Sequence, residues 1–329
     1  MLILSGNDLR AALPMRATIE AMKQAFASLS DGKAQVPLRT RLAIPSQDGL
    51  SLIMPAYVQA NKTEALAVKV VSLFPNNPNR GLAFIQAAVL VLDAETGRPT
   101  ALIEGSSLTA IRTGAAGGAA IDLLALPQSH VIAVFGAGTQ GRTQMEAACT
   151  VRKIETAFIY DPNPRLAQAF VDEMAGRGPI PKDLYVAQNS AEAVRDADII
   201  CTATTSTKPV FADGDLKAGV HITGIGSYTP TMQEIPAETV KRARVFVDSR
   251  TASLVEAGDL IIPLQAGVID EAHVSNELGE IILGRRSGRG SAQEITFFKS
   301  VGVAVQDALA AQLALENAEK MKLGHVVEF

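Results

Sequence analysis

Residues 131–144 read VIAVFGAGTQGRTQ, a short apolar run followed by a glycine-rich turn and then by the start of a helical pattern. The turn has the spacing GxGxxG and consists of Gly136, Ala137, Gly138, Thr139, Gln140 and Gly141. Its first glycine would permit a tight turn, its second would let a pyrophosphate approach the backbone, and its third would let the helix pack closely on its strand. Free N–H groups at the start of the helix would hold the phosphates. The stretch therefore predicts a dinucleotide-binding unit, with cofactor contacts at Gly136, Gly138, Thr139, Gln140 and Gly141.

An acidic residue follows the second strand of this unit. The run AFIY at 157–160 leads into Asp161, which lies 20 residues after Gly141. A carboxylate at this separation accepts hydrogen bonds from the hydroxyls of the adenosine ribose, which favours NADH over NADPH. Arg165 lies four residues further on and would receive a 2′-phosphate if its loop turned toward it, so both cofactors stay open.

The chain from residue 131 onward alternates apolar runs with helical segments. This alternation predicts a parallel sheet with helices on both faces. Residues 295–324 predict a strand followed by a helix long enough to leave this domain and dock on another. The predicted fold class is therefore α/β, with a Rossmann-type doubly wound parallel sheet.

The N-terminal part of the chain predicts a second, α+β domain. Apolar positions at helical spacing predict one amphipathic helix over 7–31. An antiparallel or mixed sheet is then predicted by strand-forming runs at 39–45, 50–57, 65–74 and 83–93, with a hairpin turn at 93–99. The segment 106–127 is rich in Ala and Gly and predicts a helix that another backbone can approach closely. We expect the domains to be 1–120 together with 305–329, and 121–304.

Composition excludes several classes of function. Lys and Arg number 30 against 34 Asp and Glu, for a formal charge of −4, so there is no basic excess for binding nucleic acid. The apolar runs are shorter than a membrane span and the N-terminus has no basic n-region, so we expect a cytoplasmic protein without a membrane partner. Cys149 and Cys201 predict buried thiols, and the four histidines are too scattered in sequence to predict a metal site.

Several stretches together resemble the ornithine cyclodeaminase and mu-crystallin family. The run EGSSLTAIRTGAAGGAA (104–120) precedes the glycine turn, as in that family. Further matching segments are VKVVSLFPNNPNRGL (68–82), GIGSYTPTMQEI (224–235) and ITFFKSVGVAVQD (295–307). The resemblance covers nearly the whole chain. It implies a homodimer in which the N-terminal region, joined by the final helix, forms the substrate-binding and dimerisation domain.

The resemblance also implies which residues bind substrate and cofactor. Arg41, Lys69 and Arg112 match the family's basic residues for a substrate carboxylate, and a guanidinium fork holds such a group bidentately. Lys69 is unusual on its own account, because it lies inside the apolar run ALAVKVV. The positions that match the family's cofactor contacts are Arg112, Thr113, Gly114, Thr202, Ala203, Thr204, Gly226, Ser227 and Ser300.

One loop departs from the family's cyclodeaminases. They carry an Asp in a pattern like GxDxPGKxEL, and Tyr228 stands in that place here. No acid occurs between Gly224 and Gln233, and the lysine of the pattern is also missing. The sequence thus resembles the family's ketimine reductases of proline metabolism, which use NADH or NADPH. These reduce Δ1-pyrroline-2-carboxylate or Δ1-piperideine-2-carboxylate to L-proline or L-pipecolate, and Lys69 or Tyr228 would then supply or relay the proton.

Two alternatives stay open at this point. An acid from another segment, such as Glu256 or Asp259, would restore an ornithine cyclodeaminase that forms L-proline and ammonia. A binding protein like mu-crystallin, which holds NADPH and a small ligand without turnover, would use the same basic residues. The size of the substrate ring, five or six atoms, also stays open because it depends on pocket volume.

Overall fold

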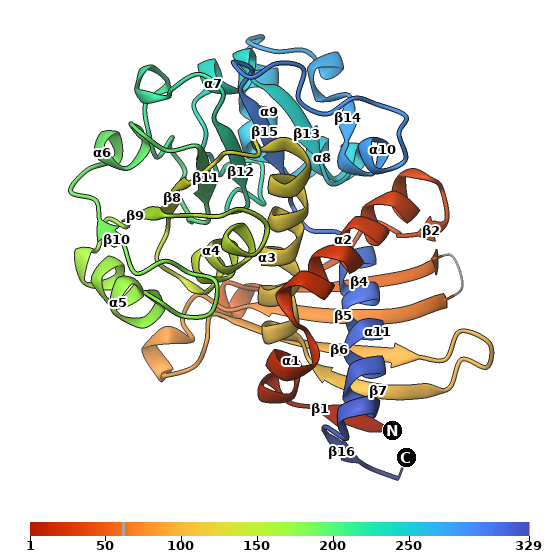
Figure 1. Cartoon of the computed structure of the whole chain (residues 1–329). Coiled ribbons are helices and arrows are strands. Elements are labelled where there is room, and N and C mark those ends of the chain that lie inside the picture. Colours follow the sequence, from red (N-terminus) through yellow and green to blue (C-terminus); the bar gives the residue numbers. More distant parts are fainter. Residues whose placement is uncertain (61–62, 329) are drawn as a thin grey trace. The chain divides into compact units, whose positions relative to one another are not determined.

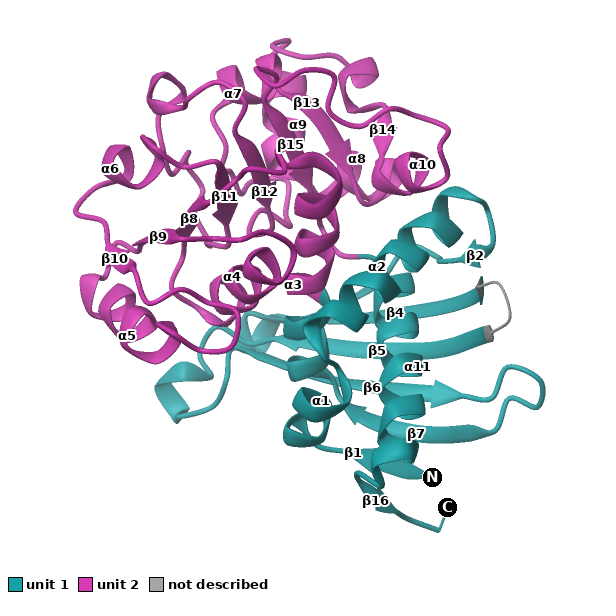
Figure 2. Cartoon of the chain, viewed as in Figure 1, with its two compact units in different colours: residues 1–112, 303–329 teal, residues 113–302 magenta. Residues whose placement is uncertain are grey.

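The computed structural model describes residues 1–60 and 63–328, and the chain forms two compact units (Figure 2). Unit 1 comprises residues 1–112 and 303–329, and unit 2 comprises residues 113–302. The boundary at residue 112 lies inside the helix α3 (Gly105–Leu124), and so does the boundary expected at residue 120.

Unit 1 contains a mixed sheet. Its strands are β1 (Leu2–Leu4), β2 (Ala34–Gln35), β3 (Thr40–Ile44), β4 (Gly49–Ala60), β5 (Thr63–Leu73), β6 (Ile85–Leu92), β7 (Pro99–Glu104) and β16 (His325–Val326). The order is β16-β1-β7-β6-β5-β4-β2, with β3 also paired to β4. Strands β4, β5, β6 and β7 pair antiparallel with one another in that order, whereas β1 runs parallel to β7. The predicted strands and the hairpin turn at 93–99 are confirmed, and Gly97 in that turn has a φ of +72°.

The single helix expected over 7–31 is wrong, because the segment forms α1 (Gly6–Ala12) and α2 (Met15–Ser30). Pro14 separates the two helices and is the N-cap of α2. A proline disfavours the helical conformation in the residue before it, and Leu13 accordingly leaves the helical region with φ −117° and ψ 69°. The apolar spacing continues through this break, so periodicity alone did not reveal it.

The long C-terminal helix α11 (Ala304–Met321) packs on one face of the unit 1 sheet and against α2 (Figure 1). Its alanines at 308, 311 and 314 are buried, and small side chains allow close packing on the strands β4, β5 and β6. Two short 3-10 helices, η1 (Pro45–Gln47) and η2 (Pro78–Arg80), complete the elements of this unit.

Unit 2 contains a parallel sheet, which confirms the predicted fold class. Its strands are β8 (Val131–Phe135), β9 (Thr156–Tyr160), β10 (Leu184–Val186), β11 (Ile199–Thr202), β12 (His221–Gly224), β13 (Arg244–Val247), β14 (Asn276–Glu277) and β15 (Thr296–Lys299). The order is β10-β9-β8-β11-β12-β15-β13-β14. The first five strands follow the 3-2-1-4-5 order of a dinucleotide-binding fold, and the late strand β15 inserts between β12 and β13.

Helices connect the parallel strands of unit 2. They are the end of α3 and then α4 (Thr139–Val151), α5 (Pro164–Met174), α6 (Ser190–Val194), η3 (Asp213–Asp215), α7 (Ala237–Arg242), α8 (Arg250–Glu256), α9 (Gly258–Gln265), η4 (Glu271–Val274) and α10 (Leu278–Ile282). Gly114 of α3 lies so close to α4 that a Cβ there would be 2.6 Å from the Thr143 carbonyl oxygen. The predicted close approach of another backbone to this helix is therefore confirmed.

Candidate functional site

The glycine turn joins β8 to α4 in a form that leaves room for a phosphate. Gly136 has a φ of +97°, a conformation that L side chains rarely adopt. A Cβ at Gly138 would meet no heavy atom within 4 Å, whereas one at Gly141 would collide with the Gly136 carbonyl oxygen. Thr139 and Gln140 begin α4, where N–H groups have no partner within the helix. These residues fit a pyrophosphate, as the sequence predicts.

Asp161 lies beside this turn at the end of β9. Its Oδ2 accepts a hydrogen bond from the Ala137 N–H at 3.0 Å, and its Oδ1 accepts one from the Asn163 N–H at 2.9 Å. A carboxylate oxygen can accept more than one hydrogen bond, so both oxygens can still accept ribose hydroxyls. Arg165 is exposed in the first turn of α5.

The loops after β11 and β12 converge on a residue that sequence reasoning missed, the buried Glu234. Its carboxylate accepts hydrogen bonds from the side chains of Thr202 (2.9 Å) and Thr204 (2.8 Å). It also accepts the backbone N–H groups of Thr204 (2.7 Å), Gly226 (2.7 Å) and Ser227 (3.2 Å). Four of the predicted cofactor contacts therefore direct donors toward an internal carboxylate. Ala203 lies between the two threonines, and its N–H donates to the Phe135 carbonyl at 2.9 Å.

Two further charged groups lie next to Glu234. Asp259 Oδ1 accepts the backbone N–H of Glu234 at 2.6 Å, and Asp259 Oδ2 lies 3.1 Å from Lys299 Nζ. All three side chains are fully buried. Burial and the neighbouring Asp259 raise the pKa of Glu234, against the opposite effects of Lys299 and the hydrogen bonds from Thr204. Asp259 is thus enclosed and paired, and Glu256, the other acid considered from the sequence, is also buried.

Ser300 belongs to a separate buried network in unit 2. Its hydroxyl donates to Asp248 Oδ2 at 2.7 Å, and that oxygen also accepts the N–H groups of Val301 (3.0 Å) and Gly302 (2.8 Å). Burial raises the pKa of Asp248. The network fixes the chain where β15 ends.

A cluster of charges in unit 1 brings together Lys69 and Arg112. Lys69 Nζ lies 2.6 Å from Asp307 Oδ2, and Arg112 Nε donates to Asp307 Oδ1 at 2.9 Å. Arg112 Nη1 donates to Gln306 Oε1 at 2.7 Å. Lys69 comes from β5, Arg112 from α3, and the two acceptors from the first turn of α11. Only the fold brings these segments together. Gln306 and Asp307 end the matching segment 295–307, but their place in the sequence alone did not mark them as site residues.

Burial sets the electrostatics of this cluster. It lowers the pKa of Lys69 to about 7, with smaller effects in the same direction from the charges of Arg112 and Arg39, while Asp307 opposes the shift. Burial would raise the pKa of Asp307, but the charges of Arg112 and Lys69 lower it overall. The cluster holds two cations and one anion when Lys69 is protonated. The uncompensated positive charge favours an incoming anion.

Arg41 differs from the other two basic residues predicted for the substrate. It pairs with Leu52 in the β3–β4 ladder and its side chain is exposed. Leu52 in turn pairs with Val71, two residues from Lys69 on β5, so Arg41 and Lys69 lie on the same face of the sheet. Arg39, which sequence reasoning passed over, acts directly on the Lys69 charge.

Tyr228 follows β12 in unit 2 and is half-buried. Burial raises the pKa of its hydroxyl, so the phenol is protonated at neutral pH and can donate a hydrogen bond. Its place in the loop that Glu234 holds is consistent with a side chain that shapes a binding site.

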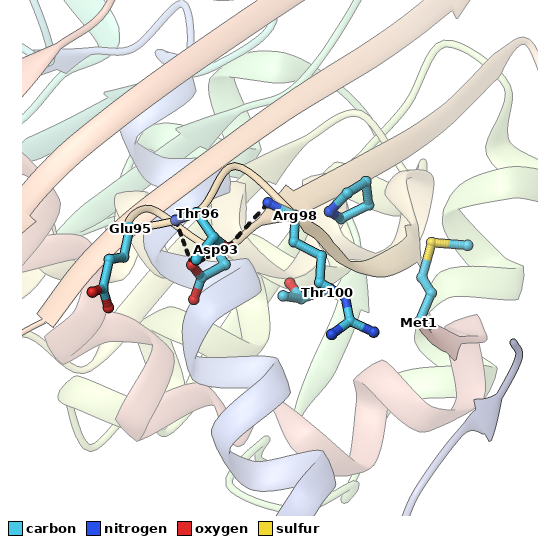
Figure 3. A pocket seen from close by; sticks show the side chains of 7 residues that line it. Met1, Asp93, Glu95, Thr96, Arg98 and Thr100 are labelled. Atoms are coloured by element: carbon cyan, nitrogen blue, oxygen red, sulfur yellow. Dashed lines mark hydrogen bonds between the residues drawn. The ribbon is translucent and has the colours of Figure 1, made fainter. Parts of the chain in front are cut away.

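The described surface of unit 1 has a hollow of about 510 Å³ beside the β6–β7 hairpin (Figure 3). Its lining residues are Met1, Asp93, Glu95, Thr96, Arg98, Pro99 and Thr100. Asp93 Oδ1 accepts hydrogen bonds from the N–H and hydroxyl of Thr96 at 2.8 and 2.6 Å, which stabilise the turn. None of the predicted site residues lines this hollow.

The part of the chain that the structure describes shows neither a metal cluster nor a membrane-spanning helix. Among residues 1–60 and 63–328, no group of three or more His, Cys, Asp and Glu side chains is arranged to hold a metal ion. No helix in those segments is both long enough and apolar enough to cross a membrane. Cys149 and Cys201 are free buried thiols, and burial raises the pKa of Cys149 to about 12.

Known proteins resemble this chain over its whole length. A Δ1-pyrroline-2-carboxylate reductase of Bacillus cereus is 38% identical over 330 residues, which span 100% of both chains. The structure of a Thermococcus litoralis Δ1-pyrroline-2-carboxylate reductase in complex with NADH and L-proline is 44% identical and matches with a TM-score of 0.94, covering 99% of this chain and 100% of that one. An archaeal alanine dehydrogenase dimer with bound NAD is 34% identical, with a TM-score of 0.92 and coverage of 100% and 99%. The model of the ornithine cyclodeaminase/mu-crystallin family matches residues 1–322, and the chain belongs to that family.

Proposed function

We propose that this protein is an NAD(P)H-dependent ketimine reductase that converts Δ1-pyrroline-2-carboxylate to L-proline. The observation that carries the proposal is the buried cluster of Lys69, Asp307 and Arg112, which has one positive charge more than it has negative charges while Lys69 is protonated. The reductases from Bacillus cereus and Thermococcus litoralis, similar along the whole chain, support the same substrate. The six-membered analogue Δ1-piperideine-2-carboxylate is a second substrate of the same chemical class.

The glycine turn and its neighbours would hold the nicotinamide nucleotide. We assign the pyrophosphate to the N–H groups at Gly138, Thr139 and Gln140, next to the open space at Gly138. The ribose of adenosine is assigned to Asp161, which favours NADH because a 2′-phosphate would meet a carboxylate. Once bound, the reduced nicotinamide supplies the hydride that adds to the imine carbon.

The groups of unit 1 would bind the substrate and hold its proton. Arg112 and Lys69 would attract the ring carboxylate. The exposed Arg41, on the same face of the sheet as Lys69, would add a third positive charge. Asp307 keeps Lys69 and Arg112 in place, because both cations bind its two oxygens. A Lys69 with a pKa of about 7 carries its proton in part of the molecules at neutral pH and can release it to the imine nitrogen. Hydride at carbon and a proton at nitrogen together complete the reduction of the C=N bond.

Tyr228 is the second candidate for the proton. Its hydroxyl has a raised pKa, so it is a weaker acid than Lys69 and is better suited to donating a hydrogen bond. The cyclodeaminase alternative needs an acid such as Asp259 near the substrate amine. Asp259 does not support it, because its side chain is fully buried and paired with Lys299. We therefore assign the reductive reaction alone.

Two copies of the chain would form the working enzyme. The similar archaeal alanine dehydrogenase is a dimer. In unit 1, the face of the sheet that α11 does not cover bears the exposed apolar residues Val70 and Leu102. We place the contact between copies on this face. Sedimentation of the purified chain at the mass of two copies is the expected result, and sedimentation as one copy at micromolar concentration would contradict it.

Turnover of the imino acid tests the proposed function. Purified protein mixed with Δ1-pyrroline-2-carboxylate should oxidise NADH in stoichiometric amounts and form L-proline, with NADPH used less efficiently. The loss of nicotinamide absorbance and the amount of L-proline measure this. Arg112→Ala should abolish most of the turnover and weaken NADH binding much less, because the Arg112 guanidinium donates to Asp307 and Gln306 of unit 1. No oxidation by folded protein with bound NADH would reject the proposal, and ammonia release from ornithine would then support the cyclodeaminase.

The pH dependence of turnover tests the role of Lys69. For the wild type, kcat/KM should fall as the pH rises through about 7, because Lys69 loses its proton there. Asp307 raises the pKa of Lys69, so Asp307→Asn should move this fall to lower pH by about 1–3 units. The profile is measured with the same imino acid for each variant, so titration of the substrate cancels.

Glu316→Gln serves as the matched control for that comparison. It changes a carboxylate on the same helix that accepts a hydrogen bond from Gln312. Because Glu316 lies about two and a half turns beyond Asp307, the change should leave the profile unchanged. An Asp307→Asn profile that coincides with the wild-type profile would show that Lys69 does not supply the proton.

A further inference from the structure

The Glu234 carboxylate accepts hydrogen bonds from two loops of unit 2, at the C-terminal ends of the parallel strands β11 and β12. The loop after β11 contributes Thr202 and Thr204, and the loop after β12 contributes Gly226 and Ser227. Five donors reach its two oxygens, so the arrangement needs an ionised group that only accepts hydrogen bonds. A neutral amide would face at least one of these donors with its own N–H.

The backbone of Glu234 is held in place by Asp259. Asp259 Oδ1 accepts the N–H groups of Glu234 at 2.6 Å and Ile235 at 3.0 Å. Lys299, at the end of β15, lies 3.1 Å from the other oxygen of Asp259. Buried charges and hydrogen bonds thereby join the segments that follow β11, β12 and β13 with the last residue of β15. Such a network is rigid only while every member keeps its partner.

The loop that Glu234 holds also touches the glycine turn. A Cβ built at Gly136 would lie 2.5 Å from the Ala203 carbonyl oxygen and 3.2 Å from Thr204 Cγ2. Ala203 and Thr204 therefore limit where the turn can lie. In the β8–β11 ladder, Phe135 pairs with Thr202, so both segments leave the sheet at the same level. A shift of the β11 loop would change the space beside the first glycine of the turn.

We propose that Glu234 is a positioning residue for the nicotinamide nucleotide. It does not touch the cofactor and acts through the β11 and β12 loops, which it holds against the glycine turn. The proposal rests on the proposed function only in that a dinucleotide binds at this turn. Loss of the Glu234 charge should release both loops and weaken cofactor binding more than it slows the reaction at saturating cofactor.

A residue with a purely structural role offers the matched control. Asp198 is another carboxylate of unit 2 that accepts backbone N–H groups, those of His130 at 2.8 Å and Val131 at 3.0 Å, and it pairs with Lys217 at 2.6 Å. It lies at the N-terminal ends of β8 and β11, whereas the glycine turn follows the C-terminal end of β8. Its loss should lower thermal stability and leave cofactor binding unchanged.

The experiment compares Glu234→Gln, Thr202→Val and Asp198→Asn with the wild type. The dissociation constant of NADH is measured by the fluorescence of the bound nucleotide without imino acid, together with the melting temperature of each protein. For Glu234→Gln we expect the dissociation constant to rise about tenfold or more. In assays with imino acid, the KM for NADH should rise similarly while kcat stays within about twofold. The Thr202 side chain is fully buried and its hydroxyl donates to Glu234, so Thr202→Val removes that donor and no surface that a nucleotide could touch. It should raise the dissociation constant about threefold to fivefold.

The proposal would be overturned if the dissociation constant of NADH rose no more in Glu234→Gln than in Asp198→Asn while the two variants lost similar amounts of melting temperature. If Glu234→Gln does not fold, Thr202→Val decides: an unchanged dissociation constant rejects the proposal and a rise supports it. The readout needs no substrate. A wild type that binds NADH without reducing the imino acid would therefore refute the proposed function and leave the test of Glu234 intact.

Discussion

The Asp307 carboxylate, buried between Lys69 and Arg112, is the interaction on which the account of this protein depends. Burying three charges is costly unless each is paired. Here one carboxylate pairs with two cations: one oxygen of Asp307 lies 2.6 Å from Lys69 Nζ and the other lies 2.9 Å from Arg112 Nε. While Lys69 is protonated, the remaining positive charge would favour the approach of an anionic substrate. The return of the chain from β15 into α11 is what brings Asp307 to this position.

The two units divide the proposed chemistry in a way that the local sequence explains. In unit 2, a glycine turn and the first turn of α4 follow the C-terminal end of the parallel strand β8. Their N–H groups would bind the phosphates of the nucleotide. In unit 1, a mixed sheet provides a rigid face on which a lysine can be buried with a lowered pKa. Glu234 and Asp307 have the same physical role in the two units, since each is a buried carboxylate that holds other groups of its unit in place.

Patterns confined to short segments of the sequence predicted much of the fold and part of the site. The spacing of Gly136, Gly138 and Gly141, and of Asp161 after them, reflects contacts within one strand–turn–helix unit, so it could be recognised directly. Glu234, Asp307 and Gln306 instead interact with residues brought near by the fold, and Asp307 lies 195 residues from Arg112. The break at Pro14 was missed because an apolar stripe continues across it.

The ionisation of Lys69 shows whether the buried cluster in unit 1 binds the substrate carboxylate. The chemical shift of its Nζ, followed by NMR against pH in protein with labelled lysine, gives its pKa in the presence of NAD⁺ with and without saturating L-proline. We expect a pKa near 7 without the amino acid, against an ordinary value of 10.5. We expect a higher pKa when the proline carboxylate adds an anion to the cluster. A pKa near the ordinary value, or one that L-proline leaves unchanged, would contradict the claim that this cluster binds the substrate carboxylate.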